Sequence, residues 1–289
     1  MGSSSVEAAA GPDLLVRSHE SLLAGMRAMD GLARGARFEE FPEGGLASRC
    51  DVPVPVVCVL FLPRAPPDPL EVLRSARKFF GRTTWWRCVT PASVRGDVVG
   101  PAEALRLKAG PGEPGMSLAP LAPAPPGPRK LRIEMVRDQD QLHDYHRVVG
   151  EAFSLPVFGV RAVLPRVPDV KNRETPAFRL LVGYEGDEPV ASSAVVVSHR
   201  VASIYMVGTR GDFRNRGYGR AITRAAAEIG RQEGCTSAYL QATQKGRPMY
   251  EAMGFRKLTD YPEWFARPGP AGAVGGTLRL LALAFRRGG

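Results

Sequence analysis

The sequence predicts a mixed α/β protein built from two domains. Three observations lead to this prediction. The chain has 289 residues, 44% of them hydrophobic, which matches roughly two globular domains and excludes disorder throughout. A proline-rich stretch divides it near the middle. Apolar runs of strand length alternate with amphipathic segments of helix length, as in α/β folds.

The proline-rich stretch covers residues 109–128, AGPGEPGMSLAPLAPAPPGP. Proline has no amide hydrogen, so we expect an extended connector here, with Met116 and Leu118 in a short strand within its first half. The predicted division is a flexible N-terminus at 1–12, an α/β domain at 13–108, the connector at 109–128, a second α/β domain at 129–267 and a flexible basic tail at 268–289.

The first half contains two predicted helices and two predicted strands, in the order helix 13–32, strand 54–62, helix 69–80 and strand 85–89. The second helix has the clearest start, because Asp68 suits an N-cap and Pro69 suits the first helical position. This half contains no chemical motif that we can identify. It is interpreted as a small α/β unit.

The second half alternates more regularly. Strands are expected at 131–136, 178–185, 188–199, 201–209, 237–242 and from Phe255, and helices at 139–153, 217–233 and 246–253. A hairpin turn is expected at Gly186-Asp187. The run of consecutive strands in the middle indicates a mixed sheet.

Several classes of protein do not fit the sequence. The best apolar run, 52–62, is broken by prolines and falls far short of the ~20 residues of a membrane span, so no membrane partner is expected. The opening MGSSSVEAAAG does not resemble a secretory signal. The four cysteines, at 50, 58, 88 and 235, form no CxxC pair. We therefore expect no disulfide framework, no metal and a cytoplasmic location.

The net charge of +10 is uneven. Residues 1–128 carry 14 Lys+Arg against 13 Asp+Glu, whereas residues 129–289 carry 25 against 16. The excess of +9 suits a negatively charged partner, either a phosphorylated cofactor or a nucleic acid. An arginine-rich composition without such a partner is the alternative.

The most informative segment is 205–220, YMVGTRGDFRNRGYGR. An apolar strand ends near Thr209, a short loop follows, and the pattern R-x-x-G-x-G at 214–219 opens a helix with one apolar stripe. The first amides of a helix lack internal partners and carry positive character, and glycine lets an anion approach them closely. The segment therefore predicts a phosphate-binding turn. A structural turn without a ligand is the alternative.

Two other phosphate motifs do not match. A Walker loop needs GxxxxGK[ST], which the chain lacks. A dinucleotide fingerprint needs a third glycine three residues after Gly219, where the chain has Ile222.

The strand, the R-N-R-G-Y-G turn and the helix resemble the acyl-CoA-binding motif of the GCN5-related N-acetyltransferase (GNAT) superfamily. A second segment, ATQKGRPMYEAMGF at 242–255, is similar to that family's A-[ST]-x-x-G-x-x-L-Y-E-x-x-G-F, with Met249 in place of Leu. The resemblance covers about residues 131–265 and implies a GNAT fold there. The first half lacks the glycine turn and is interpreted as a divergent partner domain, with a degenerate copy of the same fold as one interpretation.

The resemblance implies direct transfer of an acetyl group from acetyl-CoA to an amine, with no acyl-enzyme and no metal. It implies that the pyrophosphate and the pantetheine arm are bound by two short segments. The pantetheine arm would bind along Val207, Gly208 and Thr209 like an added strand. The remaining donor-binding residues would be Arg214, Asn215, Arg216, Gly217, Tyr218, Gly219, Arg220 and Thr243.

Two residues are the candidates for catalysis. Tyr250 occupies the family's general-acid position, and a phenol with a reference pKa near ~10 could protonate the leaving sulfur. A core tyrosine is the alternative. Glu151, at the end of the domain's first helix, is the candidate base, and a solvated surface carboxylate is the alternative. Gly254 is expected to end the helix of Tyr250 in a left-handed conformation.

Other chemically capable residues have simpler interpretations. His143 and His146 have no third metal ligand nearby in sequence. Cys235 is interpreted as a buried small hydrophobe. Trp85 and Trp86 are adjacent in a strand, so one is expected in the core and one at the surface.

The function favoured by these observations is acetyl-CoA-dependent N-acetylation of a small-molecule amine. Two alternatives stay open: a CoA-binding regulatory protein without turnover, and an aminoacyl or acyl transferase with a tRNA-linked donor. The charge supports the second only loosely, and nucleic-acid binding is not expected. The loop at 155–175 is expected to contribute to the acceptor pocket, and both a monomer and a homodimer remain compatible with the sequence.

Overall fold

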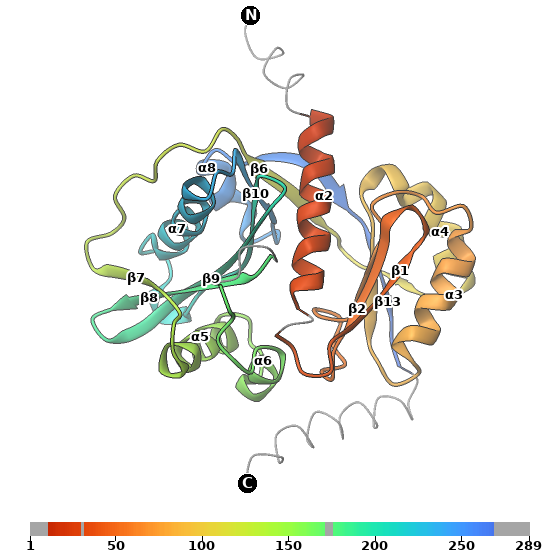
Figure 1. The fold of residues 1–289 in the computed structure, drawn as a ribbon, viewed down its shortest axis with the longest axis horizontal. Coiled ribbons are helices and arrows are strands. Elements are labelled where there is room, and N and C mark those ends of the chain that lie inside the picture. Colours follow the sequence, from red (N-terminus) through yellow and green to blue (C-terminus); the bar gives the residue numbers. More distant parts are fainter. Residues whose placement is uncertain (1–10, 30–31, 171–175, 269–289) are drawn as a thin grey trace, which may run out of the picture. The chain divides into compact units, whose positions relative to one another are not determined.

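The computed structural model describes residues 11–29, 32–170 and 176–268. These residues form two compact units, and each is described by itself (Figure 1). The first unit comprises the described residues up to Ala28, Pro114–Leu155 and Val167–Thr259. The second comprises Met29–Glu113, Pro156–Arg166 and the described residues from Asp260. Both units are assembled from separate stretches, whereas the sequence predicts contiguous domains at 13–108 and 129–267.

The first unit contains a seven-stranded mixed sheet in the order β12-β6-β11-β10-β9-β8-β7. Strands β10 and β11 pair in parallel, whereas β10 with β9, β9 with β8, β8 with β7 and β11 with β6 are antiparallel. The bounds are β6 Glu113–Leu118, β7 Leu131–Met135, β8 Phe178–Glu185, β9 Glu188–Ser198, β10 Val201–Thr209, β11 Ser237–Gln241 and β12 Arg256–Tyr261.

Helices cover both faces of this sheet. Helix α7 (Tyr218–Gln232) packs so closely on one face that a Cβ added to Gly230 would lie 2.3 Å from the Cβ of Ala202. The next residue, Ser203, points to the opposite face, where its hydroxyl lies 2.8 Å from that of Ser21 in α2 (Gly11–Ala28). Helix α5 (Gln139–Ala152) also packs on β8, β9 and β10, and helix α8 (Arg247–Ala252) follows β11.

The position of α2 differs from the sequence interpretation, which grouped the helix at 13–32 with the N-terminal domain. It packs on β9 and β10 of the first unit. Small residues permit this contact, because a Cβ on Gly25 would lie only 2.6 Å from the hydroxyl of Tyr205. The helical period predicts a helix here, but the period does not say which sheet the apolar stripe covers.

The second unit contains a six-stranded sheet in the order β1-β2-β3-β4-β13-β5. The bounds are β1 Arg37–Phe41, β2 Gly45–Arg49, β3 Val59–Phe61, β4 Trp86–Val89, β5 Lys108–Ala109 and β13 Glu263–Ala266, with helices α3 Pro69–Phe80, α4 Arg95–Ala104 and α6 Val157–Val163. Its core contains Trp86, which stacks on Phe80 at a centroid distance of 4.8 Å. As predicted, Trp86 is buried and Trp85 is partly exposed.

The two sheets contain the same topological motif, a parallel β-α-β unit. Strand β3, helix α3 and parallel strand β4 correspond in order to β10, α7 and parallel β11. In each sheet, the second of these parallel strands also pairs with an antiparallel strand from the other half of the sequence. Strand β4 pairs with β13, and strand β11 pairs with β6. The first half is therefore built on the same β-α-β plan as the second.

Most predicted elements are confirmed within two residues, including α3, α5, α7 and β8 to β10. The strand expected at 54–62 is reduced to β3, because Pro53 and Pro55 interrupt it and the amide of Val57 bonds to the carbonyl of Val54 in a turn. Strands β1 and β2 and helices α4 and α6 were not predicted. Helix α6 lies within the stretch 155–175 expected as a loop, of which 171–175 are outside the described residues. Within the part of the chain that is described, no helix is long and apolar enough to cross a bilayer.

Candidate functional site

A splayed pair of strands forms one side of the site. The parallel register between β10 and β11 ends at Ser203 and Tyr239, although β10 continues to Thr209 and β11 to Gln241. Over 204–209, β10 therefore has no β11 partner in the described pairings. A strand edge of this kind offers backbone donors and acceptors to an extended ligand.

A β-bulge bends the same stretch of β10. The register with β9 shifts between Tyr205 and Gly208, and Met206 has a positive φ of 51°. The hydroxyl of Ser192, which is fully buried, donates to the carbonyl of Met206 at 3.1 Å. The bulge thus re-aims the backbone around Val207 and is held by a hydrogen bond from the neighbouring strand. Sequence reasoning missed both Ser192 and the bulge.

The turn that opens α7 lies a few residues further along the chain. Asn215 and Gly217 have positive φ angles of 62° and 82°, and the helical ladder begins with the amide of Ala221, which bonds to the carbonyl of Gly217 at 3.0 Å. Left-handed residues beside a helix start turn successive amides toward one concavity, which suits an anion. Residues 214–217 are exposed, and the amide of Arg214 bonds to the carbonyl of Gly211 at 3.3 Å.

The two sequence motifs meet at Gly219. A Cβ at this position would lie 3.3 Å from the Sδ of Met249 in α8 and 3.4 Å from the Oγ1 of Thr209 at the end of β10. Any larger residue would have to displace one of these neighbours. The glycine therefore lets the end of β10, the start of α7 and helix α8 approach one another closely.

The arginines around the turn have different partners. Arg214 donates to the carbonyl of Thr209 at 3.2 Å and bridges the turn to β10. Arg216, expected to face the opening, instead forms an ion pair with Glu185 at 3.0 Å. The hydrogen bond from Tyr218, and more weakly the charge of Arg216, hold the pKa of Glu185 below its usual range. Part of the positive charge expected at the opening is thus paired.

Glu151 is placed beside the end of β10, but in an ion-pair network. Its Oε2 accepts from the Nε of Arg210 at 2.5 Å, and its Oε1 lies 3.5 Å from the Nε of Arg147. Both arginines also pair with Glu188. Sequence reasoning missed Arg210, although it directly follows the strand predicted to bind the donor.

Helix α8 carries Tyr250 and is fixed at both ends. Thr243 accepts from the amide of Gly246 through its Oγ1 at 3.1 Å, and Gly254 has a φ of 96°, the left-handed conformation predicted for it. Tyr250 is 7% exposed and packs edge-on against Phe255 at a centroid distance of 5.7 Å. Its ring is therefore part of the core.

The corresponding helix of the second unit has the opposite electrostatic character at its start. The carboxylate of Asp68 accepts from the amide of Glu71 at 3.0 Å, Pro69 removes a donor, and Glu71 adds a second negative charge. A carboxylate already occupies the position that an anion would take. Of these two helix starts, only that of α7 has no side-chain capping hydrogen bond.

The remaining candidates have structural roles. His146 is buried in α5, and its ring centroid lies 6.3 Å from that of His143. Among the described residues, no group of three or more His, Cys, Asp or Glu side chains could hold a metal ion. All four cysteines are free. Cys235 is buried as predicted, and burial raises its pKa to about 11.

Comparison with known proteins supports the resemblance. Residues 152–255 match the acetyltransferase (GNAT) family model, and no curated protein sequence matches. The fold is similar to a GCN5-related N-acetyltransferase from Kribbella flavida, with a TM-score of 0.60 and 19% identity over 86% of this chain and 95% of that one. It is also similar to a GCN5-related N-acetyltransferase from Sphaerobacter thermophilus, with a TM-score of 0.54 and 14% identity over 80% and 83% of the two chains.

A tandem GNAT protein from the clavulanic acid biosynthesis pathway has a TM-score of 0.50 and 14% identity over 88% of this chain and 95% of that one. These similarities extend over both units. They show that the fold of most of the chain, and not only of the segment with the two motifs, is similar to the folds of solved GNAT structures.

Proposed function

We propose that this chain, whose residues 152–255 form a GNAT-family domain, transfers an acetyl group from acetyl-CoA to the amine of a small molecule. The observation that carries the proposal is the left-handed turn at Asn215 and Gly217, which opens α7 next to the unpaired edge of β10. A turn suited to an anion thus lies close to the end of a strand edge, since a Cβ on Gly219 would lie 3.4 Å from the Oγ1 of Thr209, and CoA has a diphosphate followed by an extended amide-bearing arm.

In the proposed complex, the amides from Asn215 to Arg220 bind the pyrophosphate. The pantetheine arm adds to β10 along Val207, Gly208 and Thr209, with Thr243 on the α8 side of the site. The bulge supports this placement, because it leaves the backbone near Val207 outside the ladder with β9. A backbone amide there would face the thioester oxygen and stabilise the charge that develops on it.

In the proposed reaction, the acetyl group passes directly from acetyl-CoA to the amine. The neutral amine attacks the thioester carbon, a C–N bond forms and the C–S bond breaks. The thiolate that leaves as CoA takes a proton, which we assign to the phenol of Tyr250, and the new amide loses one. Glu151 is the candidate to accept that proton. Its Oε2 is engaged by Arg210, so we propose that it acts as a base only if this ion pair opens.

Acetyl-CoA titration by calorimetry tests the donor site. The double variant Arg214→Glu/Arg216→Glu should weaken acetyl-CoA binding by at least about 100-fold, because it reverses two charges at the diphosphate site. The matched control is Arg200→Glu/Arg256→Glu, which reverses two exposed arginines elsewhere in the first unit. Equal affinities in the two double variants would contradict the proposal.

A CoA-binding protein without turnover is the second candidate, and the pairing of Glu151 with Arg210 favours it. An amine panel with a free-thiol readout separates the two. Release of CoA that depends on one amine supports the enzyme, whereas acetyl-CoA binding without amine-dependent thiol release supports the regulatory protein. The free cysteines support a reducing, cytoplasmic setting for either.

A further inference from the structure

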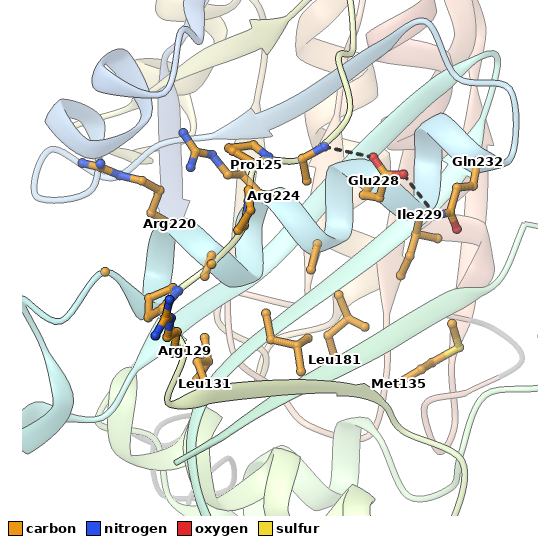
Figure 2. A pocket seen from close by; sticks show the side chains of 18 residues that line it. Pro125, Arg129, Leu131, Met135, Leu181, Arg220, Arg224, Glu228, Ile229 and Gln232 are labelled. Atoms are coloured by element: carbon orange, nitrogen blue, oxygen red, sulfur yellow. Dashed lines mark hydrogen bonds between the residues drawn. The ribbon is translucent and has the colours of Figure 1, made fainter. Parts of the chain in front are cut away.

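A cavity of about 920 Å³ lies within the first unit, away from the splayed strands. Helix α7 forms one wall, strand β7 and Leu181 of β8 form the floor, and the connector at 124–129 crosses over it (Figure 2). The cavity runs along four turns of α7, from Gly217 to Gln232. The function proposed above does not use it beyond its end at Gly217 and Arg220.

One end of the cavity is cationic. Arg220 and Arg224 extend from successive turns of α7, and Arg129 extends from the connector at the same end (Figure 2). Within residues 11–29, 32–170 and 176–268, no ion pair or side-chain hydrogen bond involves any of these three arginines. Three guanidinium groups without acidic partners create a local positive potential that suits a carboxylate or a phosphate.

The floor of the cavity is apolar toward the other end, where Glu228 and Gln232 of α7 line the wall. Leu131, Ile133 and Met135 are alternate residues of β7, so their side chains share one face of the strand. Figure 2 shows Leu181 and Met135 along the floor, away from Arg220 and Arg224, and Ile229 on the α7 side above them. Because α7 rises 1.5 Å per residue, Arg220 and Ile229 are separated by roughly 14 Å along the helix.

The covering segment is held in place. The amide of Ala124 donates to the carboxylate of Glu228 at 3.3 Å. Arg231 and Gln232 also donate to that carboxylate, and the bond from Arg231 is the main reason that the pKa of Glu228 falls to about 2. The acidic group of the cavity is thus already paired and does not neutralise the arginines. The prolines of the connector limit its conformations, which favours a cavity that exists before a ligand binds.

We propose that this cavity binds an anionic amphiphile, a medium-length alkyl chain whose carboxylate or phosphate head lies against Arg129 and Arg224 and whose chain lies between Leu181, Met135 and Ile229. The charge at one end and the apolar floor at the other carry the assignment. The nucleotide end of acetyl-CoA is the competing occupant, because Gly217 and Arg220 border both this cavity and the proposed diphosphate site.

Calorimetry with three matched probes tests the assignment on the full chain: octanoate, octyl phosphate and octan-1-ol. Both anions should bind, and the neutral alcohol should bind at least about tenfold more weakly. Comparison of the two anions identifies the preferred head. Failure of octanoate and octyl phosphate to bind, or equal binding of the alcohol, would overturn the proposal.

Variants then locate the binding. Arg129→Glu/Arg224→Glu should weaken octanoate at least about tenfold and leave acetyl-CoA affinity within about threefold, because neither arginine belongs to the proposed donor site. Ile229→Asn should weaken octanoate binding, because it removes an apolar contact with the alkyl chain of the ligand. Arg200→Glu/Arg256→Glu should leave octanoate affinity unchanged. Circular dichroism confirms that each variant is folded.

The failure of this proposal and that of the acetyl-CoA site are distinguishable. If Arg129→Glu/Arg224→Glu weakens acetyl-CoA instead, and acetyl-CoA displaces octanoate one for one, then the cavity belongs to the nucleotide and the proposal is wrong. If octanoate binds as expected while acetyl-CoA does not bind at all, the amphiphile site stands and the donor site fails.

Discussion

Arg210 binds Glu151 directly, with its Nε 2.5 Å from Oε2 of the carboxylate. The pair joins the end of β10 to the last turn of α5, so one residue beside the proposed thioester position is tied to the one carboxylate that the sequence offered as a base. The same guanidinium also bonds to Glu188 and to the carbonyl of Pro189. The network as a whole therefore fixes the strand end on which the acyl donor is proposed to bind.

Glu151→Gln tests which role the carboxylate has. If the ion pair with Arg210 stays closed during turnover, so that Glu151 is not the base, turnover should fall by less than about tenfold and acetyl-CoA affinity should stay within about twofold, because Arg210 keeps Glu188 as a partner and the amide can still accept a hydrogen bond. Steady-state kinetics with the active amine measure both. A loss of 100-fold or more, together with loss of the decrease in kcat/KM at acidic pH, would instead identify Glu151 as the base.

Tyr250→Phe tests the proposed acid. Only the hydroxyl is removed, and the ring stays packed against Phe255, so the fold and acetyl-CoA affinity should be unchanged. Turnover should fall at least about tenfold, because the leaving thiolate would lack its proton donor. The control is Tyr184→Phe, which removes a hydroxyl bonded to Asp144 at 3.0 Å in the same unit. Equal turnover in the two variants would remove Tyr250 from the mechanism.

The sequence predicts the β-α-β core of the first unit well for a physical reason. Helix α7 and strands β8 to β10 have strong local periodicity, and the two glycines of the turn are required by local geometry: Gly217 for its positive φ and Gly219 for its contacts with Met249 and Thr209. Such requirements are visible in the chain itself. They are the basis of the proposed donor site.

Contacts between distant segments were not predictable in the same way. The packing of α2 on β10 depends on Ser21 meeting Ser203, and the ion pairs of Glu151 and Arg216 join residues that are 59 and 31 positions apart from their partners. Single-sequence periodicity reports which face of an element is apolar, but not which neighbour covers it. The cavity beneath the connector was missed for the same reason.

Gly217→Ala separates the backbone conformation from the ligand site. An alanine at a φ of 82° should destabilise the fold by about 1 kcal/mol, and it should also weaken acetyl-CoA binding, because the amides of the turn would shift. Gly234→Ala is a matched control, since Gly234 has a φ of 84° at the other end of α7 and open space around it. Urea unfolding should show similar losses of stability for both variants. Weakened acetyl-CoA binding in both would indicate a global effect and not a local site.

Asp68→Ala tests the contrast between the two units. The variant should lose about 1 kcal/mol of stability, because the amide of Glu71 loses its capping partner. Acetyl-CoA should bind the natural chain with one molecule per chain, because the capped start of α3 does not accept a diphosphate, and Asp68→Ala should leave this stoichiometry unchanged since Pro69 and Glu71 remain. Two equivalent acetyl-CoA molecules per natural chain in calorimetry would contradict this account of the second unit.

The buried thiols predict a loss of stability at alkaline pH. Burial raises the pKa of Cys235 to about 11 and that of Cys58 to about 12, whereas a thiol in the unfolded chain titrates near about 8.5. The folded state therefore holds these protons more tightly, and the resulting stabilisation is complete below the unfolded pKa and declines as pH rises toward the folded value. The free energy of unfolding, measured in urea at about pH 8, 9 and 10, should fall across this range. Cys235→Ala should flatten that dependence, and an unchanged slope in the variant would show that Cys235 does not contribute to it.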